Sequence, residues 1–141
     1  MLPLRFAGRW RTASIVLLLL VLAVTLMPAV WFWPEKQQLV TWFVHADKWL
    51  HGVTFVFLAV WFAGQYRPQS YWRIALGLLA FGGLIEICQK AVTYRSAELL
   101  DLAANAAGIG IGLAIALVGL GGWCLWIEDR FVPAKAGTGG A

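Results

Sequence analysis

Ionisable and amide side chains recur at helical spacing in three separate stretches of an otherwise apolar sequence. They form three pairs, three or four residues apart: Asp47 and His51, Glu86 and Gln89, and Asp101 and Asn105. Because residues at this spacing share one face of an α-helix, each stretch presents one polar stripe. A carboxylate beside an imidazole can exchange protons, and an imidazole together with nearby cations can donate hydrogen bonds to an anion.

Two cations, Lys48 and Arg95, lie close to these stripes in the sequence. With His51 as a further donor, they indicate a site for an anionic group such as a phosphate. The predicted N-termini of the helices that carry His51 and Asn105 would direct their positive dipole ends at the same region.

Composition places these residues in a membrane. The chain has 141 residues, of which 61% are hydrophobic and 13% are charged, whereas about 25% are charged in ordinary soluble domains. Its mean hydropathy is +0.75. The net charge is +4, but the basic residues are scattered between apolar segments, so no nucleic-acid partner is expected. No cofactor motif is visible.

Four apolar stretches predict an all-α integral membrane protein. Because a spanning helix needs about 20 apolar residues, the predicted spans cover about 13–33, 46–66, 72–92 and 99–122. Short connections require adjacent antiparallel helices, and hence a four-transmembrane-helix antiparallel bundle over 13–122. Residues 1–12 form a predicted N-terminal segment, and 123–141 an interfacial segment with a flexible tail.

The basic residues predict the orientation of the bundle, since cytoplasmic loops hold an excess of Lys and Arg. With the N-terminus inside, the cytoplasmic side receives Arg5, Arg9, Arg11, Arg67, Arg73, Arg130 and Lys135. The outer side receives Lys36, Lys48, Lys90 and Arg95. Both termini are therefore predicted to be cytoplasmic.

In this topology the three polar stripes meet at the outer end of the bundle. A charged residue within a span costs about 2.5 to 3.5 kcal/mol on insertion scales, so Glu86 needs a partner or a proton. Small residues on the same stripes, Gly82, Gly108 and Gly112, would let the helix backbones approach closely. We therefore expect one pocket formed by the last three spans.

The ordered set of residues resembles the VanZ-like family of small bacterial membrane proteins, named for a member associated with teicoplanin resistance. The resemblance covers 47–112 and consists of Asp47-Lys48-x-x-His51, Glu86-x-x-Gln89, Arg95, and Asp101 followed by Asn105 and Gly108. The loop TYRSAELLD departs from the family because it lacks Pro and Gly. The resemblance implies a multi-pass protein of the bacterial inner membrane with a polar site, and implies no reaction.

The predicted function is binding of an anionic lipid or a lipid-linked envelope precursor at the outer face. The expected pocket residues are Asp47, Lys48, His51, Glu86, Gln89, Arg95, Asp101 and Asn105. An effect on teicoplanin susceptibility is implied by the resemblance alone. Assembly of the protein into an oligomer stays an open alternative.

Four alternatives stay open. The protein could be an enzyme with His51 and Glu86 as acid and base, although no nucleophile motif is visible. It could be a small transporter with Glu86 as its titrating group. A divalent metal is less favoured, because no HExxH or Cys/His spacing is present. The polar residues could also serve packing alone.

Overall fold

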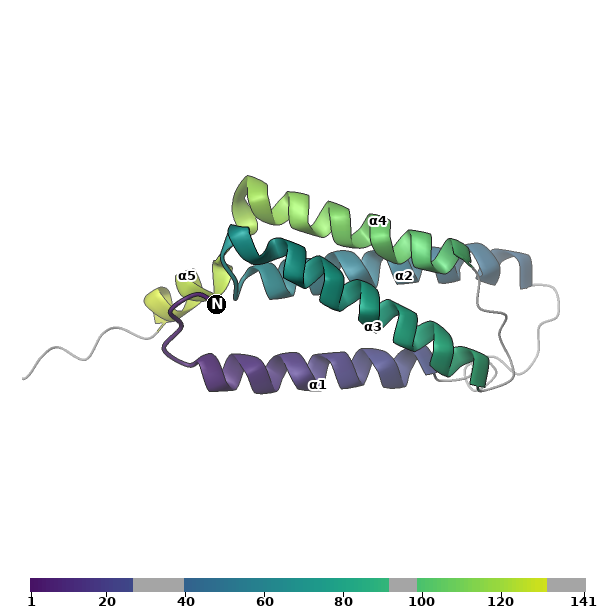
Figure 1. Ribbon diagram of the computed structural model, residues 1–141, viewed down its shortest axis with the longest axis horizontal. Coiled ribbons are helices and arrows are strands. Elements are labelled where there is room, and N and C mark those ends of the chain that lie inside the picture. The colour runs from purple at the N-terminus through teal and green to yellow at the C-terminus, as the bar shows by residue number, and fades with distance from the viewer. Residues whose placement is uncertain (27–39, 92–98, 132–141) are drawn as a thin grey trace, which may run out of the picture.

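The computed structural model describes residues 1–26, 40–91 and 99–131, with the backbone alone for 40–48 and 99. Every regular element in these ranges is helical. The elements are α1 (Ala7–Leu26), α2 (Val40–Ala63), the 3-10 turn η3 (Pro68–Ser70), α3 (Tyr71–Ala91), α4 (Leu99–Ile115), the π-helical turn η4 (Ala116–Leu120) and α5 (Trp123–Phe131). The long helices run back and forth along one axis (Figure 1).

Three helical segments are long and apolar enough to cross a membrane: Ala7–Leu26, Pro68–Ala91 and Leu100–Leu120. Their outward side chains are bulky and apolar, as shown by Leu19 and Ile87, which are 60% and 66% exposed. A helix suits such a sequence because it satisfies its backbone polar groups internally. The expectation of an all-helical, multi-pass membrane protein is confirmed at this level.

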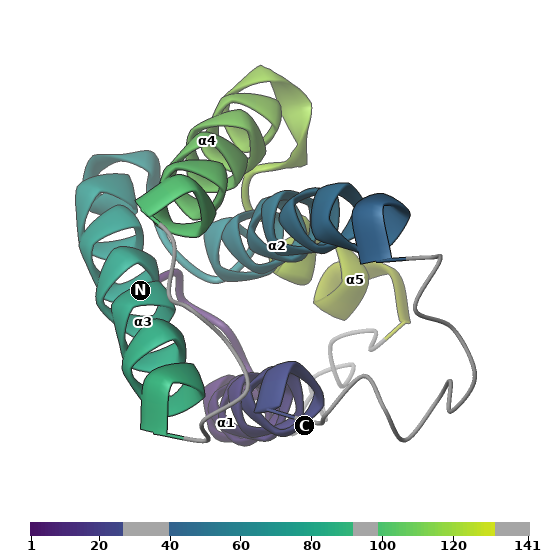
Figure 2. The same cartoon turned by 90° about the vertical axis from the view of Figure 1, so that its right-hand side faces the viewer.

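Helices α2 and α4 lie directly against each other through glycine (Figure 2). A Cβ atom added to Gly108 would collide with the carbonyl oxygen of Gly52. One added to Gly112 would lie 2.5 Å from the carbonyl oxygen of Val56. Since only glycine leaves room for the two backbones to touch, these positions set the spacing of the two helices.

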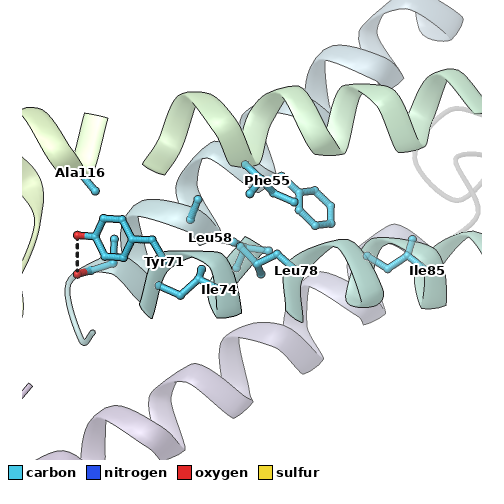
Figure 3. Close-up of a cluster of buried hydrophobic side chains, with 10 residues drawn as sticks. Phe55, Leu58, Tyr71, Ile74, Leu78, Ile85 and Ala116 are labelled. Atoms are coloured by element: carbon cyan, nitrogen blue, oxygen red, sulfur yellow. Dashed lines mark hydrogen bonds between the residues drawn. The ribbon is translucent and has the colours of Figure 1, made fainter. Parts of the chain in front are cut away.

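The apolar core fills the space between α2, α3 and α4 (Figure 3). Its largest members include Phe55 and Leu58 of α2 with Leu78 and Ile85 of α3, each no more than 3% exposed. Helix α1 packs on this core through four partly buried side chains: Leu17, Leu18, Val21 and Leu22. The core therefore joins α2, α3 and α4 closely, and α1 packs against one side of it.

The two ends of the bundle are built differently. The N-terminal segment, the turn between α2 and α3, and α5 share one end (Figure 1). There the Leu2 amide donates to the Gln65 carbonyl at 2.9 Å, and the Gly122 amide to the Ala63 carbonyl at 3.2 Å. Gly122 has φ +74°, which suits glycine and turns the chain into α5. We call this the capped end.

Helix α1 begins at Ala7, ahead of the predicted span at 13–33, where a carboxylate of α5, described below, accepts hydrogen bonds from the two backbone amides just before the helix. The second predicted span, 46–66, overlaps the longer helix α2. The end of the first predicted span lies outside the described residues, as does the tail after residue 131.

Candidate functional site

Five of the predicted site residues are buried toward the end of the bundle opposite the capped end, namely Gln89, which is described below, and four others. His51 comes from α2, Glu86 from α3, and Asp101 and Asn105 from α4. His51, Glu86 and Asp101 are 4%, 7% and 7% exposed, and Asn105 is fully buried. We call these four residues the polar cluster.

Glycine contacts bring the three helices together at the polar cluster. Gly52, next to His51, faces α4, where a Cβ atom on Gly52 would lie 3.8 Å from the carbonyl oxygen of Ala104. On α3, a Cβ atom on Gly82 would lie 2.9 Å from Nδ2 of Asn105. Glu86 follows Gly82 by one helical turn. The small residues thus let polar side chains from three helices share one buried region.

Three polar side-chain atoms of α4 lack hydrogen-bond partners within the described part of the chain. Neither Oδ1 nor Nδ2 of Asn105 has a hydrogen-bond partner there, and Oδ1 of Asp101 has none. Leaving such a buried group unpaired costs about 1 to 3 kcal/mol. By contrast, His51 and Glu86 each interact with other groups of the chain. The hydrogen-bonding capacity left over therefore lies on α4.

The other predicted residues fall in different places. Gln89 is 5% exposed, and its Nε2 donates to the carbonyl oxygen of Thr25 at 3.1 Å, so it joins α3 to α1. Asp47 and Lys48 lie on α2, but their side chains are outside the described part. Arg95 is also outside the described residues. No group of three or more metal-ligating residues is found among those described.

A second buried polar network occupies the capped end, and sequence reasoning missed it. Glu128 of α5 is 3% exposed. Its carboxylate accepts hydrogen bonds from the Arg5 amide at 2.7 Å, the Phe6 amide at 3.1 Å and Nε1 of Trp10 at 2.8 Å. A carboxylate at the start of a helix also complements the helix dipole.

These contacts change the acidity of Glu128. Burial raises the pKa of its carboxyl group. The hydrogen bonds from Arg5, Phe6 and Trp10, together with the charge of Arg5, lower that pKa by more than burial raises it. The net effect is a pKa below the ordinary value, so Glu128 is ionised near neutral pH. It acts as a fixed acceptor for the two backbone amides that precede α1 and for the indole of Trp10 in its first turn.

The remaining buried polar groups of the capped end are also paired. Oγ of Ser14 donates to the Trp10 carbonyl at 2.9 Å and accepts from Nε1 of Trp61 and Nε2 of Gln65, each at 2.9 Å. Trp10, Trp61 and Trp123 stack edge to face, with centroids 5.4 to 5.8 Å apart. The buried polar groups of the capped end therefore satisfy one another, and they join α1 to α2 and α5.

A sequence signal for this joint does exist. Ser14 and Gln65 both lie near the same predicted membrane face, inside or beside apolar spans, where a polar residue needs a partner. Glu128 lies in the short stretch WCLWIEDRF, between aromatic and apolar residues. The sequence alone does not show which groups these residues bind, because partners such as Arg5 and Glu128 are 123 residues apart.

Comparison with known proteins gives no relative. No family model, no curated protein and no solved structure matches the chain.

Proposed function

We propose that the chain is a four-span protein of the bacterial inner membrane, VanZ-like in its pattern of polar residues. Its polar cluster binds the phosphate-bearing headgroup of a membrane lipid or of a lipid-linked envelope precursor. The cluster opens toward the outer face, and both termini are cytoplasmic.

The arrangement of the helices supports this topology. Helix α2 has 24 residues and is about 36 Å long at 1.5 Å per residue, enough for a fourth crossing of about 30 Å of hydrocarbon. The N-terminal segment and α5 share the capped end (Figure 1), which requires an even number of crossings between them. Basic residues of these segments, such as Arg5, Arg9 and Arg130, favour the cytoplasm for that end.

One observation carries the binding proposal, namely that Oδ1 of Asp101 and both polar side-chain atoms of Asn105 have no hydrogen-bond partner among the described residues. A network that served packing alone would be expected to satisfy its own groups, because an unpaired group is costly in an apolar medium. A ligand that supplies the missing partners recovers that cost. Lys48 and Arg95 would supply the positive charge for a phosphate, with Asp47 and Glu86 to orient them.

The test removes both cations. We expect the double variant Lys48→Gln, Arg95→Gln to lose at least about tenfold in lipid binding, measured by native mass spectrometry of the full chain with phosphatidylglycerol, since a charge-assisted hydrogen bond contributes about 1.5 to 3 kcal/mol. Lys90→Gln is the matched control, because Lys90 is exposed near the same end of α3. Unchanged binding in the double variant would overturn the proposal.

A further inference from the structure

Exposed positive charge among the described residues is concentrated at the capped end. Six exposed arginines lie in the N-terminal segment, the first two turns of α1, the turn between α2 and α3, the start of α3, and α5: Arg5, Arg9, Arg11, Arg67, Arg73 and Arg130. Asp129 is the one exposed carboxylate in the described ranges, because Glu128 is buried. The capped end therefore presents a strongly cationic surface.

This surface lies where a headgroup layer meets the bundle. Helices α1, α3 and α4 are long and apolar enough to cross a membrane, and each has one end at the capped end (Figure 1). Exposed aromatic side chains accompany the arginines there, namely Trp72 at the start of α3 and Trp126 and Phe131 of α5. Amphipathic aromatic rings of this kind are enriched where hydrocarbon gives way to headgroups.

The cations of the capped end are all arginine in the part of the chain that the structure describes. Topology alone does not require this choice, since lysine satisfies the excess of positive charge in cytoplasmic loops equally well. The guanidinium group is planar and binds a phosphate through two parallel hydrogen bonds, whereas the ammonium group of lysine acts as a point charge. A surface of arginines without lysine is therefore suited to phosphate groups.

Aromatic rings position two of these arginines. Cζ of Arg9 lies 4.8 Å from the centroid of the Phe6 ring, and Cζ of Arg73 lies 5.2 Å from that of Trp72. A contact of this type uses the face of the guanidinium group and leaves the N–H donors at its edge available. Neither arginine forms an ion pair with a carboxylate among the described residues. Arg9 and Arg73 are thus positioned to bind an external anion.

We propose that the capped end binds the phosphates of anionic phospholipids in the leaflet that it faces, through Arg9 and Arg73. A lipid with net negative charge is favoured over a zwitterionic one, because basic residues at a membrane surface are attracted by the charge of the leaflet. This surface lies at the opposite end from the polar cluster. The inference is therefore independent of the proposed function and of which side of the membrane the capped end occupies.

The experiment measures lipid binding to the full chain in detergent by native mass spectrometry. Phosphatidylglycerol is compared with phosphatidylcholine of the same acyl chains, and we expect the anionic lipid to bind at least about fivefold more tightly. The double variant Arg9→Gln, Arg73→Gln should lower the affinity for phosphatidylglycerol at least about tenfold, since one basic residue near an anionic surface contributes about fivefold. Its affinity for phosphatidylcholine should change less than about twofold.

Two controls separate geometry from charge. Arg9→Lys, Arg73→Lys keeps the charge that orients the helices, and we expect it to lose about threefold in affinity for phosphatidylglycerol, because an ammonium group does not donate two parallel hydrogen bonds. Lys90→Gln removes an exposed cation from the other end of α3 and should change the affinity less than about twofold. The lysine variant also serves if the glutamine variant does not fold.

A further arm distinguishes this surface from the polar cluster. The loss caused by Arg9→Gln, Arg73→Gln should persist when Lys48→Gln, Arg95→Gln is already present. A loss that disappears in that background overturns the inference, as does equal binding of the two lipids by the unchanged chain. Wild-type affinity in the glutamine variant, or in the lysine variant, also overturns it. The proposed function stands or fails separately, on Lys48→Gln, Arg95→Gln alone.

Discussion

The capped end and the polar cluster are both buried and polar, yet they differ in how their polar groups are paired. At the capped end, Glu128 accepts three hydrogen bonds and Oγ of Ser14 joins three residues. In the polar cluster, Asn105 is fully buried and has no hydrogen-bond partner among the described residues.

This difference separates two uses of polarity in a membrane protein. Groups that satisfy one another hold helices together, and replacing one leaves its partners unpaired. Groups that lack partners contribute little to the fold and cost about 1 to 3 kcal/mol each. Substitutions at the capped end should therefore lower stability, whereas substitutions of Asn105 should alter binding.

The largest loss of stability is expected for Glu128→Ala. The substitution leaves the amides of Arg5 and Phe6 and the indole of Trp10 without an acceptor. We expect a loss of about 3 kcal/mol in the free energy of unfolding, measured by reversible denaturation in detergent. Asp129→Ala is the control, because Asp129 is 69% exposed in an ion pair of 3.5 Å and should cost less than about 0.5 kcal/mol. Equal losses would refute the capping role.

A smaller loss is expected for Gly108→Ala, which acts between the two ends. The new methyl group collides with the Gly52 carbonyl and forces α2 away from α4. We expect a loss of about 2 kcal/mol from overpacking, together with weaker lipid binding, because the same contact positions His51. Gly110→Ala, with nothing within 4 Å, should be neutral or stabilising, as alanine favours helix. Thermal melting and lipid retention check both; a harmless Gly108→Ala would show that the close contact is dispensable.

Ser14→Ala should cost about 1 kcal/mol, because Trp61 and Gln65 each lose an acceptor. Thr12→Ala is the control, since Thr12 is exposed on the same helix. If Ser14→Ala melts like the wild type while Asn105→Leu is strongly destabilised, the contrast between the two ends would be reversed.

The smallest effect is a dependence of stability on pH at the capped end. The pKa of Glu128 in the folded protein lies below its ordinary value of 4.5, so the unfolded chain takes up a proton first as the pH falls. The contribution of Glu128 is complete above about pH 5 and is lost as the pH drops through the folded pKa. In Glu128→Gln this part of the acid sensitivity should be absent, as measured by melting temperatures between pH 7 and pH 3. An unchanged slope would contradict the assignment.

Much of the architecture follows from local patterns in the sequence. Apolar runs longer than a membrane is thick predict helices wherever they occur, and the i, i+4 spacing of Asp101 and Asn105 correctly indicates a shared buried face. The burial of His51 and Glu86 follows from the same reasoning, because charged groups within spans turn inward.

Other features depend on contacts that spacing does not encode. The hydrogen bond from Gln89 to α1 requires the position of a helix more than 60 residues earlier, and the bonds of Glu128 need α1 and α5 side by side. The helix start at Ala7 follows from the same cap. Short-range patterns thus predict which residues are buried, and the tertiary arrangement decides what they bind.

The cap on α1 has a consequence for the order in which the protein matures. Arg5 leaves the ribosome 123 residues before Glu128, so α1 is synthesised while the amides just ahead of it still lack their acceptor. The joint closes only after α5 has been synthesised. A chain truncated ahead of Trp123 would lack Glu128, so the amides of Arg5 and Phe6 and the indole of Trp10 would never gain this acceptor.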